Sequence, residues 1–452
     1  MIPLTLTEVA AAVDGVLAGA DPDAVVTGTV EFDSRKVTPG GLFAAFDGEQ
    51  VDGHDFAAAT VAAGAVAVLA TKPVEAPAIM VDDARAALGR LARAVLARLP
   101  ELTVIGLTGS SGKTTTKDLL AGLLAGHAPT VATAGSFNNE LGLPYTVLRA
   151  TAETRYLVLE MGARGIGHIR YLCEIAPPSI GVVLNVGTSH IGEFGSQDAI
   201  ARAKGELVEA LPPTGLAVLN ADDPRVLAMR DRTRAPVVTV GESAGADLRA
   251  TDVTLDARGR ASFDLDGTRI TLAAAGRHQV GNALLAIAAA RHLGAPIAPI
   301  SAVRIASERR MDVFDRADGS TVVDDSYNAN PASMAAALRA LVTIGAGRRT
   351  VAVLGYMAEL GEQERSGHEE VGRLAAELGV DRLIAVGHDA APLRDGAAAV
   401  ARWGGESVQV TDQEAAVAWL RAHLLPGDVV LVKGSRYRTW QVADALREEA
   451  VA

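Results

Sequence analysis

The 452-residue sequence is poor in cysteine and in positive charge. Its one cysteine, Cys173, excludes a disulfide framework and a zinc site built from several cysteines, as expected for a protein of the reducing cytosol. The 42 Lys and Arg residues are outnumbered by 54 Asp and Glu residues, which gives a formal net charge of −12. This balance argues against nucleic acid or an anionic membrane surface as the main partner, although a local basic pocket for phosphates stays possible.

Long apolar runs are also missing. The longest uncharged run of small residues, at 56–70, is mostly alanine and is too weakly apolar to span a bilayer. The N-terminus lacks a basic region followed by an apolar segment and a cleavage site. We therefore expect a cytoplasmic protein without membrane or nucleic-acid partners.

The most informative segment that is present is TVIGLTGSSGKTTTK at 103–117. Residues 103–107 predict a buried strand and residues 117–124 a helix, with a glycine-rich turn between them. In such a turn, backbone N–H groups and the positive end of the helix dipole meet an anion, and Lys113 adds charge. Leu107 replaces the glycine of the usual spacing, so we interpret the segment as a variant phosphate-binding loop.

The length predicts about three domains. Residues 1–99 predict a small α/β domain with a helix near 6–13 and strands at 25–32 and 42–46. In residues 100–312, strand-length runs alternate with helical segments, which predicts a doubly wound, mostly parallel sheet with antiparallel hairpins attached to it at 247–275. Residues 313–452 alternate in the same way and predict a third α/β domain.

Two polar residues end separate strands of the central sheet. Glu160 lies near the end of the run at 156–161 and His190 follows the run at 180–186, at the carboxyl ends where ligands of such sheets collect. Either residue alone would more often be a helix cap or a solvated side chain. Together, beside a phosphate-binding loop, they predict a metal site.

Lys204 stands near the middle of an apolar stripe on the helix expected at 198–211. Its stem could lie along the stripe while its ammonium reaches solvent, or the lysine could be buried and paired or chemically altered near the site. The sequence favours neither alternative. In the first domain, Asp33, Ser34, Arg35, Asp52 and His54 are interpreted, taken alone, as turn caps and surface ion pairs.

An ordered series of motifs resembles the Mur ligase family over essentially the whole chain. The motifs are DSRKVTPGGLFAAFDGEQVDGHDF, TGSSGKTTTK, TAGSFNNELGLP, LEMGAR, NVGTSHIGEFGS, the lysine of RAKGEL, DDSYNANP and VKGSR. The resemblance implies a monomeric three-domain ligase that uses ATP and Mg²⁺. Its substrates would be a UDP-N-acetylmuramoyl-tripeptide and D-alanyl-D-alanine, joined through an acyl phosphate.

The resemblance also implies residue roles. Lys113, Lys204 and His190 would act in catalysis, and Lys204 matches a lysine that the family carbamylates. Mg²⁺ would be held by Thr114, Glu160, His190 and the altered Lys204. ATP would be bound by Gly109, Ser110, Ser111, Gly112, Lys113, Thr114, Thr115, Asn282, Arg310, Asp325 and Asn328. The acceptor would meet Ser34, Arg35, Thr133, Asn138 and Asn139, and the dipeptide Lys433, Ser435 and Arg436.

Two positions depart from the family pattern, and two rival functions remain. Gln279 stands where the family usually has asparagine, and Tyr356 where it often has aspartate. One rival is a ligase for a single amino acid or a folate glutamate, but the sequence has neither a DNPR-like segment nor a zinc-binding cysteine set. The other is a regulatory ATPase, which would hydrolyse ATP without added small substrates.

Overall fold

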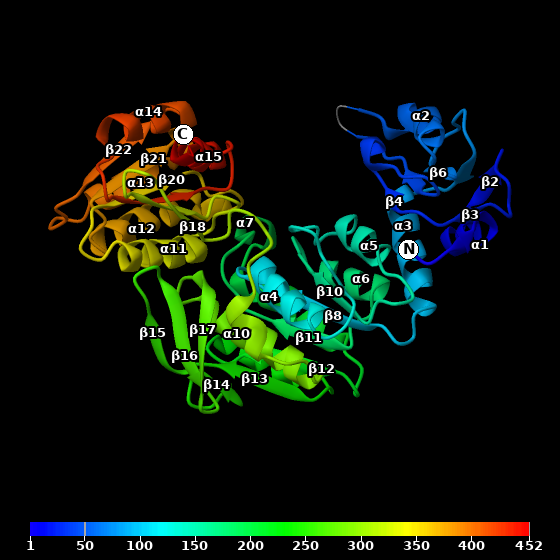
Figure 1. Cartoon of the computed structure of the whole chain (residues 1–452), viewed down its shortest axis with the longest axis horizontal. Coiled ribbons are helices and arrows are strands. Elements are labelled where there is room, and N and C mark those ends of the chain that lie inside the picture. Colours follow the sequence, from blue (N-terminus) through cyan, green and yellow to red (C-terminus); the bar gives the residue numbers. More distant parts are fainter. Residues whose placement is uncertain (49–50, 452) are drawn as a thin grey trace.

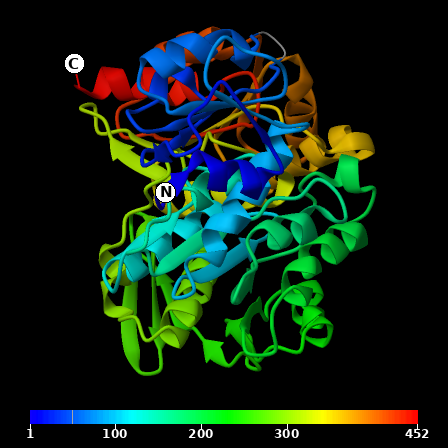
Figure 2. The ribbon, with the colours of Figure 1, turned by 90° about the vertical axis from the view of Figure 1, so that its right-hand side faces the viewer.

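The computed structural model describes residues 1–48 and 51–451, which form three α/β domains, each around its own sheet (Figure 1). The N-terminal and C-terminal domains stand on either side of the central one, and Figure 2 views the molecule from the N-terminal side. Residues 49 and 50 of the motif at 33–56, and residue 452, lie outside the described residues. Within the described chain, no helix combines the length and the apolar character that crossing a membrane requires.

The N-terminal domain contains a five-stranded sheet in the order β2-β7-β6-β5-β4. Its strands are β2 (Val16–Ala18), β4 (Val30–Glu31), β5 (Leu42–Ala44), β6 (Ala67–Ala70) and β7 (Ala78–Met80). A separate antiparallel pair is formed by β1 (Leu4–Thr5) and β3 (Val25–Val26). The helices are α1 (Leu6–Val13), α2 (Ala57–Ala62) and α3 (Ala84–Ala97).

The single strand expected at 25–32 was wrong, because the chain bends at Thr27 and Gly28. The backbone N–H groups of both residues donate to the carbonyl of Gly40, at 3.0 and 2.8 Å. This contact separates β3 from β4, and the two strands join different sheets. The helix expected near 6–13 is confirmed as α1.

The central domain is organised around a seven-stranded sheet in the order β14-β13-β12-β11-β8-β10-β9, in which every pairing is parallel. The strands are β8 (Thr103–Thr108), β9 (Thr130–Ala132), β10 (Tyr156–Glu160), β11 (Ile180–Val183), β12 (Leu216–Asn220), β13 (Val237–Gly241) and β14 (Leu248–Arg249). The helices are α4 (Lys113–Ala125), α5 (Gly142–Val147), α6 (His168–Ile175), α7 (Ile191–Phe194), α8 (Gln197–Glu209), α9 (Pro224–Leu227) and α10 (Gln279–His292).

Helices cover both faces of this sheet, as the sequence predicted. Leu120 of α4 and Leu284 of α10 belong to one core cluster with Ile105 of β8. Leu207 of α8 and Leu157 of β10 belong to another, which continues into the N-terminal domain through α3. The apolar strands are therefore buried from both sides, and their carboxyl ends are left as the place for polar residues.

Two details of this domain differ from expectation. The helix after the phosphate-binding loop begins at Lys113 and not at Lys117, because Gly112 (φ 81°) turns the chain directly into it. The antiparallel hairpins are not attached to the parallel sheet. They form their own sheet of β15 (Thr251–Leu255), β16 (Arg260–Leu265) and β17 (Thr268–Ala275), whose buried residues Phe263 and Leu265 share a cluster with α10.

The C-terminal domain contains a six-stranded sheet in the order β18-β19-β23-β20-β21-β22, in which only β18 is antiparallel. Its strands are β18 (Asp312–Asp315), β19 (Thr321–Asp324), β20 (Thr350–Leu354), β21 (Arg382–Val386), β22 (Glu406–Val410) and β23 (Val429–Lys433). The helices are α11 (Pro331–Ile344), α12 (Glu364–Glu377), α13 (Ala391–Ala398), α14 (Gln413–His423) and α15 (Trp440–Val451). All three tryptophans of the chain, Trp403, Trp419 and Trp440, belong to this domain.

Candidate functional site

The phosphate-binding loop joins β8 to α4 and is held in shape by Asn185, just beyond the end of β11. The Asn185 Oδ1 atom accepts from the backbone N–H groups of Ser110 and Ser111, at 3.0 and 2.9 Å. Its Nδ2 atom donates to the carbonyl of Ser111 at 3.0 Å. Lys113 donates to the carbonyl of Gly109 at 2.8 Å, so the lysine lies folded over the loop.

Gly112 is required by its surroundings as well as by its positive φ angle. A Cβ atom at this position would lie 2.5 Å from Oδ1 of Asn282 on α10. The Nδ2 atom of Asn282 donates to Oε1 of Gln279 at 2.8 Å, so the departure at position 279 supplies a partner to the asparagine beside the loop.

Thr114, at the start of α4, meets residues from two other segments. Its hydroxyl donates to Oε2 of Glu160 at 2.9 Å, and Glu160 is almost fully buried. The other carboxylate oxygen of Glu160 accepts from Nδ2 of Asn138 at 2.7 Å. Arg310, on the segment before β18, donates to Oγ1 of Thr114 at 3.2 Å and lies over the ring of Tyr327. A hydroxyl and a carboxylate, both oxygen donors, therefore converge beside the loop.

Two lysines and a histidine face the same cleft. Lys113 keeps part of its surface exposed, yet its ammonium lies deep enough for burial to lower its pKa. Lys204 is 5% exposed, and burial, followed by the charge of Lys113, lowers its pKa well below the ordinary value. Within the described residues Lys204 has no ion pair or hydrogen-bond partner at Nζ, and its side chain lines the cleft and does not extend along the outer surface as snorkelling would require. Burial also lowers the pKa of His190.

The C-terminal domain contributes a buried lysine to the cleft. Nζ of Lys433, at the end of β23, donates to Oδ2 of Asp325 at 2.5 Å and to the carbonyl of Asn328 at 2.8 Å. The second oxygen of Asp325 accepts from the backbone N–H of Met311 at 3.2 Å. Burial lowers the pKa of Lys433, while Asp325 opposes this effect.

Contacts between the central and C-terminal domains close one side of the site. Asn330, which caps α11, donates to the hydroxyl of Ser189 at 2.7 Å and to that of Ser111 at 3.2 Å. The carboxylate of Glu359 contacts Nδ1 of His190. The loop and the histidine thus each have a partner from the C-terminal domain.

These residues line one cleft of about 1430 Å³ between the central domain, the segment before β18 and the C-terminal domain. The sequence-predicted residues that line it are Gly109, Ser110, Ser111, Gly112, Lys113, Thr114, Thr115, Asn138, Asn139, Glu160, His190, Lys204, Asn282, Arg310, Asp325, Asn328 and Lys433. The positively charged side chains and main-chain N–H groups of this cleft can bind a polyphosphate. The converging hydroxyl and carboxylate can bind a divalent cation beside it.

Five of the sequence-predicted residues lie outside this cleft. Thr133 is 1% exposed, and its hydroxyl accepts from the backbone N–H of Glu160 at 3.0 Å, so it supports Glu160. Ser34 and Arg35 lie in the N-terminal domain, in a helical turn capped by Asp33, and Arg35 pairs with that aspartate at 2.8 Å. Ser435 accepts from the backbone N–H of Ala358 at 3.1 Å, and Arg436 pairs with Glu359 at 3.1 Å.

Tyr356, the second departure from the family pattern, lies beside the Ser435 turn. Its hydroxyl donates to Oε2 of Glu364 at 2.6 Å, and its ring stacks on that of His368. Its carbonyl accepts from the hydroxyl of Ser435 at 3.0 Å. Tyrosine thus has a packed and bonded place here that a short carboxylate could not fill.

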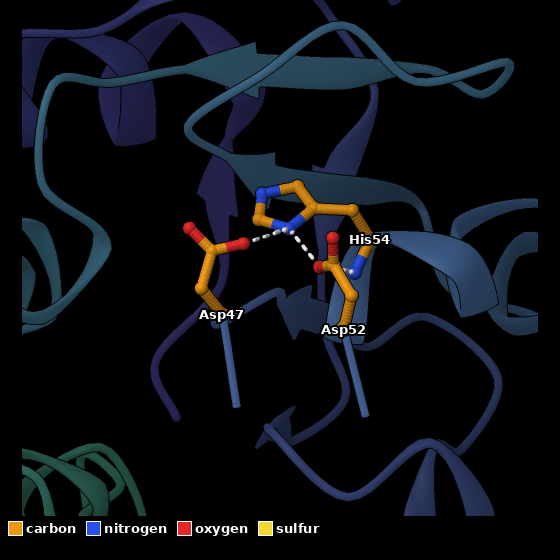
Figure 3. Close-up of side chains that lie close together, drawn as sticks. All are labelled: Asp47, Asp52 and His54. Atoms are coloured by element: carbon orange, nitrogen blue, oxygen red, sulfur yellow. Dashed lines mark hydrogen bonds and ion pairs between the residues drawn. The ribbon is translucent and has the colours of Figure 1, made fainter. Parts of the chain in front are cut away.

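A second group of side chains, Asp47, Asp52 and His54, could suggest a metal site (Figure 3). Nδ1 of His54 lies 2.7 Å from Asp52 and 3.6 Å from Asp47. Nε2 of His54 accepts from the backbone N–H of Thr71 at 3.1 Å, so the ring is already fixed. Lys72 pairs with both carboxylates and lowers the pKa of Asp52. The cation of this group is Lys72, and Asp52 caps the turn by accepting from the backbone N–H of His54, as interpreted from the sequence. His54 is 6% exposed and accepts at Nε2, so it is a buried, hydrogen-bonded ring and not a member of a surface ion pair.

Several residues that shape the site have no role that the sequence alone indicates. The sequence places Asn185 at the ligand edge of the central sheet, but its role in holding the loop is visible only in the structure. Asn330 and Glu359 could not be found from the sequence, because only the packing of two domains brings them to Ser111 and His190.

Comparisons with known proteins cover all three domains. Residues 28–96 match the model described as "Mur ligase family, catalytic domain", residues 107–290 the "Mur ligase middle domain", and residues 309–436 the "Mur ligase, glutamate ligase domain". The UDP-N-acetylmuramoyl-tripeptide--D-alanyl-D-alanine ligase of Mycobacterium tuberculosis is 50% identical over 99% of this chain and 98% of its own length. The ligase of the same name from Escherichia coli is 36% identical over 99% of both chains.

Solved structures agree with these matches. A crystal structure of MurF from Acinetobacter baumannii has a TM-score of 0.89 at 33% identity and covers 99% of both chains. MurF from Thermotoga maritima in complex with ADP has a TM-score of 0.81 at 30% identity, with 94% of this chain and 98% of that one covered.

Proposed function

The chain belongs to the Mur ligase family, and we propose that it joins D-alanyl-D-alanine to a UDP-N-acetylmuramoyl-tripeptide at the expense of ATP, as in peptidoglycan synthesis. It is an ATP-dependent, ADP-forming ligase. The observation that carries the specific reaction is the full-length likeness to ligases of that name, together with a cleft in which a phosphate-binding loop faces Glu160 and Lys204.

The three substrates are assigned to three domains. We assign residues 1–99 to the UDP-muramoyl-peptide, with Ser34 and Arg35 at the uridine end and Asn138 and Asn139 of the central domain at the peptide. Residues 100–312 bind ATP, with Asn282 toward the adenine. Residues 313–452 receive the dipeptide, near the turn of Lys433, Ser435 and Arg436. We infer a cytoplasmic monomer without nucleic-acid or membrane partners.

The chemistry follows from the weak reactivity of a carboxylate at neutral pH. The peptide carboxylate oxygen attacks the γ-phosphorus of ATP, so that ADP leaves and an acyl phosphate forms. The dipeptide amine then attacks the acyl carbon, phosphate leaves, and the amine loses a proton as the amide forms. Lys113 and Arg310 stand where they would stabilise charge on the transferred phosphoryl group, which is the main demand of such a transfer. Closure of the domains would exclude water from the acyl phosphate.

Mg²⁺ fits the donor set of the cleft. The hydroxyl of Thr114 and the carboxylate of Glu160 already converge, and oxygen donors of this kind suit the ion. His190 and Lys204 would complete its surroundings. When bound, the ion would neutralise phosphate charge.

Lys204 meets the physical requirements for a carbamate. Its lowered pKa leaves a fraction of the amine neutral, and a neutral amine can attack CO₂ to form a C–N bond with loss of a proton. The product is an anion in a place where an unpaired buried cation faces Lys113, so the modification relieves a repulsion. We propose that Lys204 acts in this form.

A phosphate-release assay with each substrate omitted in turn tests the reaction. We expect sustained release only with ATP, UDP-muramoyl-tripeptide and D-alanyl-D-alanine together. Free D-alanine should support little turnover, because it makes fewer of the contacts that orient the amine. Lys113→Ala serves as the control and should cost about 3 kcal/mol or more of transition-state stabilisation. Equal rates with a single amino acid would contradict the dipeptide, and release from ATP alone would favour the regulatory ATPase.

A further inference from the structure

A buried ion pair lies one helical turn beyond the phosphate-binding loop. Nζ of Lys117 is 2.6 Å from Oδ1 of Asp118, and the two side chains are 3% and 4% exposed. Neither residue lines the cleft. Two charges taken out of water cost free energy that apolar residues of similar volume would not, so stability alone is a weak explanation for the pair.

On one side, the pair holds the residue that supports Glu160. Nζ of Lys117 donates to the carbonyl of Thr133 at 2.8 Å. The hydroxyl of Thr133 accepts from the backbone N–H of Glu160 at 3.0 Å. A shift of Thr133 would therefore move Glu160, whose carboxylate accepts from Thr114.

On the other side, the pair holds the segment that carries Arg310. Oδ2 of Asp118 accepts from the backbone N–H of Ser307 at 2.9 Å, and Nζ of Lys117 lies 3.4 Å from the hydroxyl of Ser307. Three residues later, Arg310 donates to the hydroxyls of Thr114 and Ser136, at 3.2 and 3.3 Å.

Both connections lead back to Thr114, which lies one turn before Lys117 on α4. We propose that Lys117 and Asp118 are positioning residues that fix the segments of Glu160 and Arg310 relative to Thr114. The pair does not touch the reactants. It sets the distances between three groups that come from α4, β10 and the segment before β18.

The kinetic consequence follows from what each group does. The loop that would bind the phosphates is held in shape by Asn185 and not by the pair, so ATP should still bind when the pair is removed. Phosphoryl transfer depends on alignment, and a displacement near 1 Å can lower its rate about a hundredfold. Loss of the pair should therefore lower kcat and change the KM for ATP little.

The variant that tests this is the double substitution Lys117→Met and Asp118→Asn. Methionine keeps the length of the lysine stem, and the asparagine oxygen can still accept from Ser307, so no uncompensated charge stays buried. The matched control is Arg349→Met with Asp428→Asn, which removes the ion pair of 2.6 Å between two residues away from the cleft.

We expect the Lys117/Asp118 variant to lose about a hundredfold in kcat, with a KM for ATP and an ADP affinity within about threefold of wild type. The control should keep its kcat even if its Tm falls. The single variant Lys117→Arg can still donate to Thr133, so its kcat should lie between that of the double variant and that of the wild type. A kcat within twofold of wild type in the double variant, or an equal loss of kcat in the control, would overturn the proposal.

This inference rests on the proposed ligation reaction, so a second readout is independent of turnover. Amide hydrogen exchange at 133–139 and 303–311 should accelerate in the Lys117/Asp118 variant and stay unchanged in the control. Unchanged exchange at both segments would reject the positioning role even if the ligation reaction stands. If exchange at both segments is faster in the variant but the wild-type protein does not carry out the ligation, the proposed reaction is rejected. The role of Lys117 and Asp118 in fixing the two segments would then still stand.

Discussion

Lys204 shows what a helix pattern can and cannot establish about one residue. The periodicity placed it on an apolar stripe of α8 and left open whether its ammonium reaches solvent. The structure buries the side chain at 5% exposure and turns it toward the cleft. The burial depends on how α8 packs against its neighbours and on the nearby Lys113, and neither is encoded in the local sequence.

The carbamate proposal predicts a chemical rescue. Lys204→Ala should lose nearly all activity, because the vacated site lacks the anion, and acetate should restore part of it by occupying the same space. Formamide, which is uncharged and of similar size, should restore none. An alanine variant with wild-type turnover would return Lys204 to a structural role.

Cys173 predicts a second residue-scale result. Burial, followed by the charges of Glu206 and Glu174, raises the pKa of its thiol to about 12. At pH 8 the native thiol should therefore react with iodoacetamide about a thousandfold more slowly than an exposed thiol. Labelling followed by mass spectrometry can compare the native protein with the protein in concentrated urea. Equal labelling rates would contradict the burial.

At the scale of elements, the sequence was most reliable where an apolar run met a glycine-rich turn. The strand β8 and the existence of α4 could be predicted from that pattern. The start of α4 could not, because threonines at 114–116 are weak helix formers and the tertiary contact of Gly112 with Asn282 decides where the helix begins. The alternation of apolar and polar residues predicts the hairpins of β15–β17, but it does not predict that they form a separate sheet. That separation depends on the packing of their buried residues against α10.

The loop after β20 is connected to α12 through His368, which predicts a pH dependence. The ring is fully buried, Nε2 accepts from the backbone N–H of Met357 at 2.9 Å, and Nδ1 lies 2.6 Å from the carbonyl of Glu364. Burial lowers its pKa below the ordinary 6.5. Below pH 6.5 the unfolded state therefore binds a proton that the folded state does not, and stability falls.

Urea unfolding at pH 8 and pH 5.5 measures this effect. Between pH 8 and pH 5.5, the free energy of unfolding of the wild type should fall by about 1 kcal/mol more than that of His368→Gln. His292→Gln, at an exposed position on α10, is the matched control and should behave as the wild type does. An identical fall in the free energy of unfolding in all three proteins would contradict the assignment of His368 as a neutral ring that accepts a hydrogen bond at Nε2.

At the scale of the whole molecule, the sequence predicted three α/β domains but none of their mutual contacts. Asn330 and Glu359 reach the central domain from the C-terminal one, and no local pattern indicates this. No local pattern indicates the contact between Gly192 and Gly361 either. Gly192 lies in α7 and Gly361 in the turn before α12, and their backbones touch. A Cβ atom on Gly192 would lie 2.7 Å from the backbone nitrogen of Gly361.

This contact predicts the effect of a single side chain at the domain interface. Gly192→Val should separate the two backbones, withdraw Glu359 from His190, and lower turnover about tenfold. Small-angle scattering should show a larger radius of gyration. Gly245→Ala, where a Cβ atom meets nothing within 4 Å, should change neither quantity. If Gly192→Val keeps the turnover and the radius of gyration of the wild type, this contact between the domains is not needed for activity.

The placement of all three tryptophans in the C-terminal domain makes that domain the only one with intrinsic indole emission. Trp440 also lies near Arg309, whose guanidinium carbon is 5.7 Å from the indole ring centre, beside the segment that joins the two domains. Emission excited at the red edge would therefore follow unfolding of the C-terminal domain alone, while far-ultraviolet ellipticity sums over all three. A lag between the two signals during denaturation would reveal which part of the enzyme opens first, without any engineered probe.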